Sequence, residues 1–282
     1  MLPQDVADGG EGIMDRDYPL AGSVDFKRPS MARMHDFLLG GRDHYPVDRA
    51  ACAELMARAP VRALARAQRE FLGQVVAHLA GRLGVRQFLD VGCGFPSPQP
   101  AHRIAAKAAA GGQVAYVYVD SDPLVVAHGQ ALLEGNGRTA VVQGDLRDPS
   151  ALLRQKRLAS VIDFGRPVAC LYVSVLHCVP DEDSPAQAVR ELLSHLAPGS
   201  FLAVSHLICD DPAAGEELSG YLRQAAGWGR VRAREEIDAV FVGLEVHAPG
   251  LCDVTAWHPA GKRPTPPVDR GWCEYGGLAR LA

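Results

Sequence analysis

Residues 88–97, Phe-Leu-Asp-Val-Gly-Cys-Gly-Phe-Pro-Ser, decide the fold of this protein. An apolar run that begins at Gln87 ends in the glycine pair Gly92 and Gly94. Glycines directly after a buried strand let the backbone approach a ligand closely. The helix that follows such a loop presents free N–H groups, which suit a carboxylate or a phosphate. Because tight turns with two glycines are common, the meaning of this loop depends on the elements around it.

Short β-branched or aromatic runs alternate with helical stretches through the middle of the chain. This rhythm predicts right-handed crossovers and a parallel sheet with helices on both faces. The almost continuous apolar character of the runs fits a sheet that is buried on both sides. Strands are expected at 87–91, 115–119, 139–143, 168–173 and 200–205, and helices at 101–111, 123–134, 149–158 and 185–196.

The C-terminal part of the chain indicates how the sheet is completed. Two helical stretches are followed by short runs at 244–247 and 252–257, which the turn 248–250 separates. A turn of this length predicts an antiparallel pair. The expected fold is therefore α/β, with a Rossmann-like seven-stranded sheet of order 3-2-1-4-5-7-6 whose strand 7 is antiparallel, and with an N-terminal helical cap.

Four segments are expected along the chain. Residues 1–27 form a flexible N-terminal tail, and residues 28–86 form the helical cap or lid. Residues 87–258 form the Rossmann-like domain. Because residues 259–270 contain four prolines, we expect 259–282 to be an extended strap that packs on the same domain.

The composition excludes several classes of protein. The chain has 282 residues with 48% hydrophobic and 22% charged residues, which is ordinary for a globular protein. A net charge of -4 disfavours a nucleic-acid partner, which would require a basic face. Seven cysteines without a C-x-x-C pair predict reduced thiols and no metal site. With neither a membrane span nor a signal peptide in the pattern, we expect a cytoplasmic protein without a membrane partner, and a homo-oligomer stays open.

Two features of the glycine loop distinguish between candidate cofactors. A dinucleotide fingerprint would place its third glycine at Ser97, and Pro96 before it removes a backbone donor. Asp90 precedes the glycines, where a carboxylate matches the α-amino group of S-adenosylmethionine (SAM). Both features favour SAM as the cofactor over the nicotinamide of a dehydrogenase.

Acidic residues close the next two strands at the same edge of the sheet. Asp120 can accept from both ribose hydroxyls, or it can cap the following helix, a role for which Asp122 is better placed. In a fold of this type the acid after the third strand lies beside the adenine, which is the role expected for Asp145; the alternative is a helix cap, for which Asp148 is better placed. The predicted cofactor contacts are Asp90, Gly92, Cys93, Gly94, Asp120, Ser121, Asp145, Leu146 and Ser174.

Two histidines are candidate catalytic residues. The end of the fourth strand places Ser174 and His177 beside the sulfonium and the acceptor, where His177 can act as a general base or can shape the pocket. Methyl transfer often needs positioning more than proton removal, which favours the second role. His206, at the expected end of the fifth strand, is a second candidate for the pocket wall, with a structural histidine as the alternative.

Residues 34–49, Met-His-Asp-Phe-Leu-Leu-Gly-Gly-Arg-Asp-His-Tyr-Pro-Val-Asp-Arg, precede the sheet and surround a glycine pair with polar and aromatic side chains. A solvated helix-loop-helix is the simpler interpretation. Hinge glycines beside side chains suited to a ligand instead indicate a lid over the cofactor and the acceptor. The candidate acceptor-binding residues of this cap are His35, Arg42, His44 and Tyr45.

Taken in order, these motifs resemble a family of actinobacterial SAM-dependent methyltransferases of largely unassigned substrate. The resemblance runs from about residue 28 to residue 259 and implies a class I methyltransferase fold with SAM bound. It implies cofactor contacts at the 92–94 loop, Asp120, Asp145 and Ser174. The segments that carry it are 35–45, 88–97, 117–125, 145–149, 175–181 and 198–206.

The cap departs from the family pattern, because His35, Arg42 and His44 replace the usual Tyr, Lys and Asn. These changes leave the acceptor open. The first hypothesis is an enzyme that transfers the SAM methyl group to an oxygen or nitrogen atom of a small-molecule acceptor, such as a secondary metabolite. The alternatives are a SAM-binding sensor or pseudoenzyme, and a SAM-dependent enzyme that does not methylate, such as a cyclase.

Overall fold

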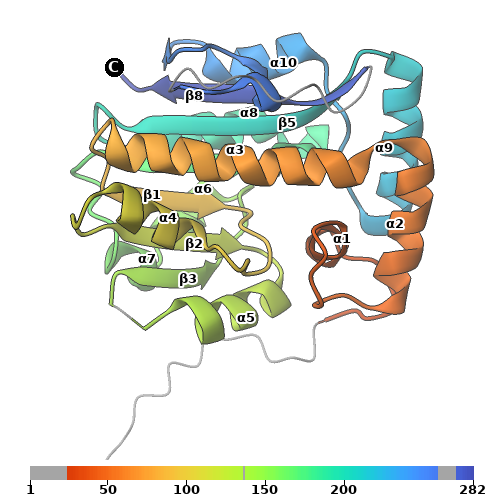
Figure 1. Ribbon diagram of the computed structural model, residues 1–282, viewed down its shortest axis with the longest axis horizontal. Helices are drawn as coiled ribbons and strands as arrows, with labels where there is room; N and C mark the ends of the chain where they lie inside the picture. The colour runs from red at the N-terminus through yellow and green to blue at the C-terminus, as the bar shows by residue number, and fades with distance from the viewer. Residues whose placement is uncertain (1–23, 136, 260–270) are drawn as a thin grey trace, which may run out of the picture.

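The structure, a computed structural model, describes residues 24–135, 137–259 and 271–282. Most of the expected N-terminal tail and the proline-rich part of the expected strap lie outside the described residues. Within them, the strands form one sheet with the order β3-β2-β1-β4-β5-β8-β6, and β7 pairs with β8 (Figure 1). This order confirms the predicted α/β fold.

Five parallel strands form the centre of the sheet, and their apolar sequences explain their burial on both faces. Every residue of β1 and β4 is buried, and β2 and β3 each have one half-buried end. The parallel register places the carboxyl ends of these strands side by side at one edge. The strands are β1 (Gln87–Val91), β2 (Ala115–Asp120), β3 (Thr139–Gln143), β4 (Ala169–Val173) and β5 (Phe201–Cys209).

The antiparallel strand was placed wrongly in the sequence prediction. It is β8 (Trp272–Arg280), which pairs with β5 over nine positions from Phe201↔Arg280 to Cys209↔Trp272. The runs expected as strands 6 and 7 contribute only β6 (Glu245–Val246) and β7 (Cys252–Asp253), and both pair with β8. Residues 272–280 thus lie in the sheet and not in a surface strap. Two glycines and a buried glutamate mask the strand pattern in this segment.

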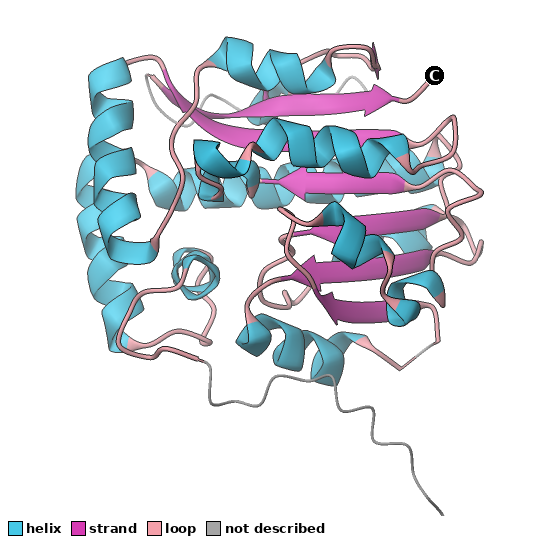
Figure 2. Cartoon of the chain, turned by 180° about the vertical axis from the view of Figure 1, so that it is seen from behind, coloured by secondary structure: helices cyan, strands magenta, loops and turns pink. Residues whose placement is uncertain are grey.

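Helices cover both faces of the sheet, as the alternating pattern predicts. One face packs against α3 (Val61–Gly81), α4 (Ala101–Ala108) and α5 (Pro123–Leu133) (Figure 1). The opposite face, seen from behind in Figure 2, packs against a second set of helices. No helix among the described residues has the length and apolarity to cross a membrane. The second set is α6 (Pro149–Leu153), α7 (Lys156–Ala159), α8 (Pro185–Ser194), α10 (Arg234–Asp238) and the 3-10 helix η4 (Ala239–Phe241).

The cap forms a separate apolar cluster beside the carboxyl edge of the sheet (Figure 1). It contains α1 (Met31–Leu38), α2 (Pro46–Arg58), the start of α3, and α9 (Pro212–Ala226), which follows β5. A buried ion pair joins α1 to α2, with 2.9 Å between Arg33 Nε and Asp48 Oδ2. Asp48 also accepts from the backbone N–H groups of Ser30 and Tyr45. These contacts hold the first cap helix against the second, over the ligand edge of the sheet.

Candidate cofactor and acceptor site

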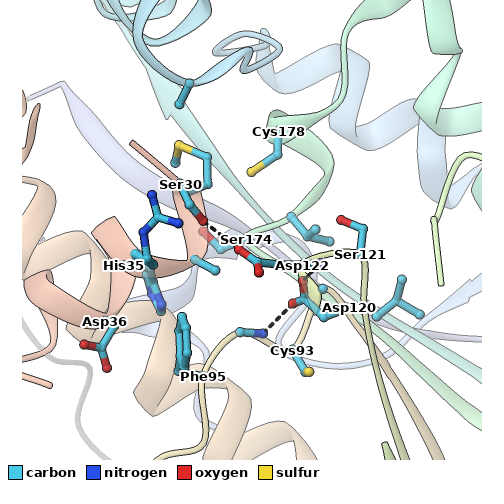
Figure 3. Close-up of a pocket in the computed structure, with 18 of the residues that line it drawn as sticks. Ser30, His35, Asp36, Cys93, Phe95, Asp120, Ser121, Asp122, Ser174 and Cys178 are labelled. Carbon is cyan, nitrogen blue, oxygen red and sulfur yellow. Dashed lines mark hydrogen bonds between the residues drawn. The ribbon is translucent and has the colours of Figure 1, made fainter. Parts of the chain in front are cut away.

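A cavity of about 810 Å³ lies between the carboxyl ends of the parallel strands and the cap. Its volume falls in the range of small-molecule sites. The 92–94 loop, Asp90, Asp120 and Asp145 all line it, so the structure brings the three predicted strand-end acids to one place. In Figure 3, His35 of the cap lies across the cavity from Asp120.

The glycine loop is folded against the end of β2. The N–H groups of Gly92 and Cys93 donate to Val119 O at 2.8 and 3.1 Å. Gly92 and Gly94 have φ angles of 72° and 65°, which favour glycine. A Cβ at Gly92 would also lie 2.2 Å from Val175 Cγ2. The loop therefore needs glycine for its backbone conformation and for its close contact with the wall of the cavity.

Asp120 joins the end of β2 to this loop. Its Oδ2 accepts from Gly94 N at 2.9 Å (Figure 3), and its Oδ1 accepts from Asp122 N at 3.0 Å. Burial raises the pKa of the Asp120 carboxyl to about 6. The carboxylate lines the cavity, where it is positioned to accept further hydrogen bonds from a ligand. Ser121, directly after it, also lines the cavity, as do Cys93 and Leu146.

The helix-capping predictions for the two neighbouring acids are confirmed. Asp122 accepts from Leu124 N at 2.9 Å and caps α5, and Asp148 accepts from Ala151 N at 2.8 Å and caps α6. Asp122 has a second role, because its Oδ2 accepts from Ser30 Oγ at 2.9 Å (Figure 3). This bond joins the start of the cap to the cofactor edge of the sheet.

Asp90 lies on the floor of the cavity at the end of β1. Its Oδ2 accepts from the Tyr116 hydroxyl at 2.8 Å, and its burial raises the pKa of the carboxyl to about 6. The nearby Arg69 guanidinium, on α3, lowers the pKa of Asp90 and also that of His35. Arg69 lines the cavity, and no described residue forms an ion pair or hydrogen bond with its guanidinium. It is therefore a cation available to an anionic ligand group.

Asp145 is held by a neighbour that the sequence analysis did not consider. Arg147 donates from Nε to both carboxylate oxygens at 2.9 Å, and its Nη1 donates to Asp183 at 3.1 Å. These bonds lower the pKa of Asp145. Both residues line the cavity at its more exposed rim. A role at the adenine would thus involve the Asp145–Arg147 pair and not a free carboxylate.

The end of β4 carries an unusual backbone conformation. Ser174 has a φ of 58°, a left-handed value that is uncommon for serine. Its Oγ donates to Glu274 Oε1 at 2.8 Å, and Ser205 Oγ donates to Glu274 Oε2 at 2.9 Å. Glu274, on β8, is 3% exposed, and burial raises its pKa to about 7. The only sequence signal for this residue is a charged side chain inside an otherwise apolar C-terminal run.

The two candidate catalytic histidines lie in different places. His177 lines the cavity, and its Nδ1 accepts from Leu207 N at 3.1 Å, so Nε2 carries the proton. Burial lowers its pKa well below 6.5. His206 is fully buried and lies outside the cavity lining. Its Nδ1 donates to Leu207 O at 2.8 Å, and Arg232 lies 3.3 Å from its Nε2.

The placement of His206 corrects its expected role in the pocket wall. The fifth strand was expected to end at residue 205, but β5 continues to Cys209. His206 therefore lies within a strand that β8 pairs along its whole length, and not at a strand end that faces a ligand. With both ring nitrogens engaged inside the protein, it corresponds to the structural alternative.

Of the four predicted cap residues, only His35 reaches the cavity. Its Nε2 lies 2.7 Å from Gln68 Oε1, and because an amide oxygen only accepts, Nε2 carries the proton and Nδ1 keeps its lone pair. Burial lowers the pKa of His35 to about 4. His44 packs on Phe37, and Tyr45 on Phe26, while Arg42 is outside the lining.

Gln68 and Arg69 are the main site residues that the sequence analysis missed. Both lie on α3, within the segment 28–86 that was expected only to form the helical cap. Gln68 is buried and connects His35 to β4, because its Nε2 donates to Val173 O at 3.5 Å. Two adjacent polar residues next to the apolar face of a long helix are the sequence feature from which Gln68 and Arg69 could have been identified as site residues. No group of metal-ligating side chains is found within the described part of the chain.

Comparison with known proteins identifies the family. Residues 18–282 match a family described as S-adenosyl methyltransferase. The chain belongs to this family. The methyltransferase is 34% identical to a Thermobifida fusca protein that is provisionally assigned as a methyltransferase, with a TM-score of 0.83 over 91% of this chain and 96% of that one. It is 35% identical to a DUF574 family protein from Streptomyces avermitilis, with a TM-score of 0.81 over 92% and 99%. No functionally curated protein matches it.

The resemblance, the methyltransferase activity and the cofactor predicted from the sequence are thereby confirmed. The methyltransferase uses SAM, and the residues around its cavity fit this cofactor. They combine a glycine loop in which a side chain at Gly92 would clash with Val175, a buried carboxylate at Asp120, and the guanidinium of Arg69, which no described residue pairs. These groups match a compact amino-acid end, a ribose and a carboxylate, respectively.

Proposed function

We propose that this methyltransferase transfers the methyl group of SAM to an oxygen or nitrogen atom of a small-molecule acceptor. One observation carries the proposal, namely that a single cavity extends from the strand-end loops to His35 and Gln68 at the cap. The cofactor and the acceptor can therefore share one enclosed space. In this arrangement Asp120 holds the ribose, the 92–94 loop holds the methionine part, and Asp145 with its arginine partner lies beside the adenine.

The closed cap supports an acceptor of small size. Ser30 donates to Asp122 across the cavity edge, and His128 of α5 lies 3.5 Å from Asp43 of the cap loop. His128 also packs edge-on against Phe95 of the glycine loop. These contacts join the cap to the loops at the carboxyl edge of the sheet and narrow the space left for an acceptor between them. A small polar molecule can be enclosed here without breaking them, and closure excludes water.

The protein contributes positioning more than proton chemistry. SAM supplies an activated methyl group when it is bound. The lowered pKa values of His35 and His177 keep both imidazoles neutral at pH 7. His35 presents the Nδ1 lone pair as a hydrogen-bond acceptor, which suits an acceptor molecule with an O–H or N–H group. Aligning that group with the methyl carbon is the main contribution expected from the cavity.

A labelling experiment tests the acceptor class. The purified protein is incubated with SAM carrying a radiolabelled methyl group and with separate low-mass, protein and nucleic-acid fractions of a cell extract. We expect labelled product in the low-mass fraction only, and none with the Asp120→Ala variant. Label in a macromolecular fraction would contradict the small-molecule proposal. Tight SAM binding without any labelled product would instead favour a sensor.

Arg69 provides a separate test of how the cofactor is oriented. Replacing Arg69 with Ala is expected to weaken SAM and S-adenosylhomocysteine (SAH) binding roughly tenfold, because a charge-assisted contact to the ligand carboxylate is lost. Adenosine lacks the carboxylate, so its affinity should not change. Arg66→Ala is the matched control, because Arg66 is exposed on the same helix. Isothermal titration calorimetry measures the affinities for SAM, SAH and adenosine. An equal loss of affinity for adenosine would contradict an orientation in which the ligand carboxylate contacts Arg69.

A further inference from the structure

Glu274 is a buried acid that has no counter-ion among the described residues. It is 3% exposed and lies on β8 behind the cavity, outside its lining. Within residues 24–135, 137–259 and 271–282, no cationic side chain forms an ion pair with it. A buried carboxylate without a cation is costly, because its loss of hydration is not compensated by an opposite charge. Because buried ionisable groups of this kind are concentrated at functional sites, we expect a functional role of Glu274 in addition to any effect on stability.

One of the hydrogen bonds that the Glu274 carboxylate accepts connects it to the cavity wall. Ser205 donates from inside β5, and Ser174 donates from the end of β4, where its residue lines the cavity. Because the only hydroxyl hydrogen of Ser174 is used by Glu274, the Oγ has only lone pairs left for a ligand. Glu274 thus determines the polarity of the wall at this point, since an oxygen whose hydrogen points toward Glu274 presents only lone pairs to the cavity, which repel anions and attract positive charge.

The left-handed backbone at Ser174 strengthens this interpretation. Serine rarely adopts a φ of 58°, and surrounding contacts must hold it there. The bond to Glu274 on β8 and the backbone bond from Ser174 N to Ser205 O on β5, at 3.0 Å, provide two such contacts. The serine is therefore held in one orientation before any ligand arrives, which is the condition for electrostatic selection.

We infer that Glu274 makes the cavity select the cationic cofactor SAM over its neutral product SAH, acting through the oriented hydroxyl of Ser174. The inference rests on the proposed position of the sulfonium beside Ser174. A negative charge in the protein interior acts more strongly on a nearby cation than it would in water, and the oriented oxygen adds a weak C–H···O contact to the methyl group. Glu274 itself does not touch the ligand and is a positioning residue.

The same arrangement favours product release. During transfer the bond from sulfur to the methyl carbon breaks and a bond from that carbon to the acceptor atom forms. The sulfonium becomes a neutral thioether, and the acceptor atom takes over the positive charge and then loses its proton to solvent. Once the sulfur is neutral, Glu274 and Ser174 no longer attract it. The cavity thus holds the substrate form of the cofactor more tightly than the product form.

Glu274→Gln tests the inference because it keeps the shape of the side chain. The amide can donate to Ser174 Oγ, which allows the serine hydrogen to turn toward the ligand. We expect SAM affinity to fall on the order of tenfold, while SAH affinity stays within about twofold of the wild type. Calorimetric titrations with SAM and SAH at about pH 8.5 measure both, because the carboxyl, with a pKa of about 7, is then ionised.

Three further variants make the outcome decisive. Glu245→Gln is the matched control, because Glu245 lies on β6, is 70% exposed, and should change neither affinity. Ser174→Gly retains the left-handed backbone but removes the oxygen, so it should lower the SAM to SAH preference as Glu274→Gln does. It also serves as the test if Glu274→Gln does not fold. The double variant should show no further loss of preference.

Each result then has one meaning. Equal weakening of SAM and SAH in Glu274→Gln would show that the residue only supports the fold, and it would overturn the inference while leaving the proposed function intact. An unchanged preference in both Glu274→Gln and Ser174→Gly would also overturn it. Failure of the wild-type protein to bind either ligand would instead contradict the proposed cofactor site.

Discussion

Replacing Asp120 with Ala is expected to reduce the affinity for both SAM and SAH at least about 100-fold, because the ribose loses a bidentate charged acceptor. The change also removes the hydrogen bond that Asp120 accepts from Gly94 N, which holds the glycine loop in the conformation of the structure. Two effects that both weaken cofactor binding therefore coincide at one residue. Isothermal titration calorimetry with each ligand gives the size of the loss.

Asp148→Ala is the matched control for this prediction. It removes the same chemical group from an N-cap outside the cavity lining. We expect it to cost about 1 kcal/mol of stability through the lost cap and to leave cofactor affinity unchanged. Asp120→Asn separates the two roles of Asp120, because an amide can still hold the loop but carries no charge. Wild-type affinity in Asp120→Ala would show that the ribose assignment is wrong.

Gly276→Ala should be the most destabilising glycine substitution in the sheet. Gly276 pairs with Ser205 at the middle of the antiparallel ladder between β8 and β5. A Cβ there would lie 1.9 Å from Val204 O and 2.8 Å from its carbonyl carbon, both backbone atoms that cannot rotate away. The two strands would have to separate along a ladder that also positions Glu274. We expect a loss of about 3 kcal/mol in the free energy of unfolding.

Urea unfolding of Gly220→Ala provides the comparison. Gly220 lies inside α9, where a Cβ would meet only Arg223 Nη2 at 4.0 Å. Alanine at this position should therefore stabilise the protein by about 0.5–1 kcal/mol, the usual difference in helix propensity. If both variants changed stability equally, close approach of the β5 and β8 backbones would not explain why residue 276 is glycine.

The cofactor edge could be predicted from the sequence because its signals are local. A glycine loop after one apolar strand and acids after the next two lie at fixed positions relative to their own strands. Parallel pairing then brings Asp90, Asp120 and Asp145 to one edge without further information. The capping roles of Asp122 and Asp148 could likewise be predicted from the sequence, because each residue caps the helix that directly follows it.

The acceptor side of the cavity could not be predicted in the same way. His35 reaches it and His44 does not, although both lie in one short segment of the cap. Their orientation depends on how α1 packs against α3, where Gln68 connects His35 to β4. His206 lies inside the sheet and not in the pocket wall, because β5 pairs with β8 beyond residue 205. These outcomes depend on contacts between segments that are far apart in the sequence.

The sequence by itself determined the glycine loop at 92–94, the strand-end acids, the cofactor and the order of the five parallel strands. Each of these follows from local spacing and from the common direction of parallel strands. Only the tertiary structure decided that β8 completes the sheet and that Glu274 reaches Ser174 from 100 residues away along the chain. The physical reason is that burial strengthens this interaction, since the carboxylate of Glu274 orients a distant serine only because the fold has removed that carboxylate from water.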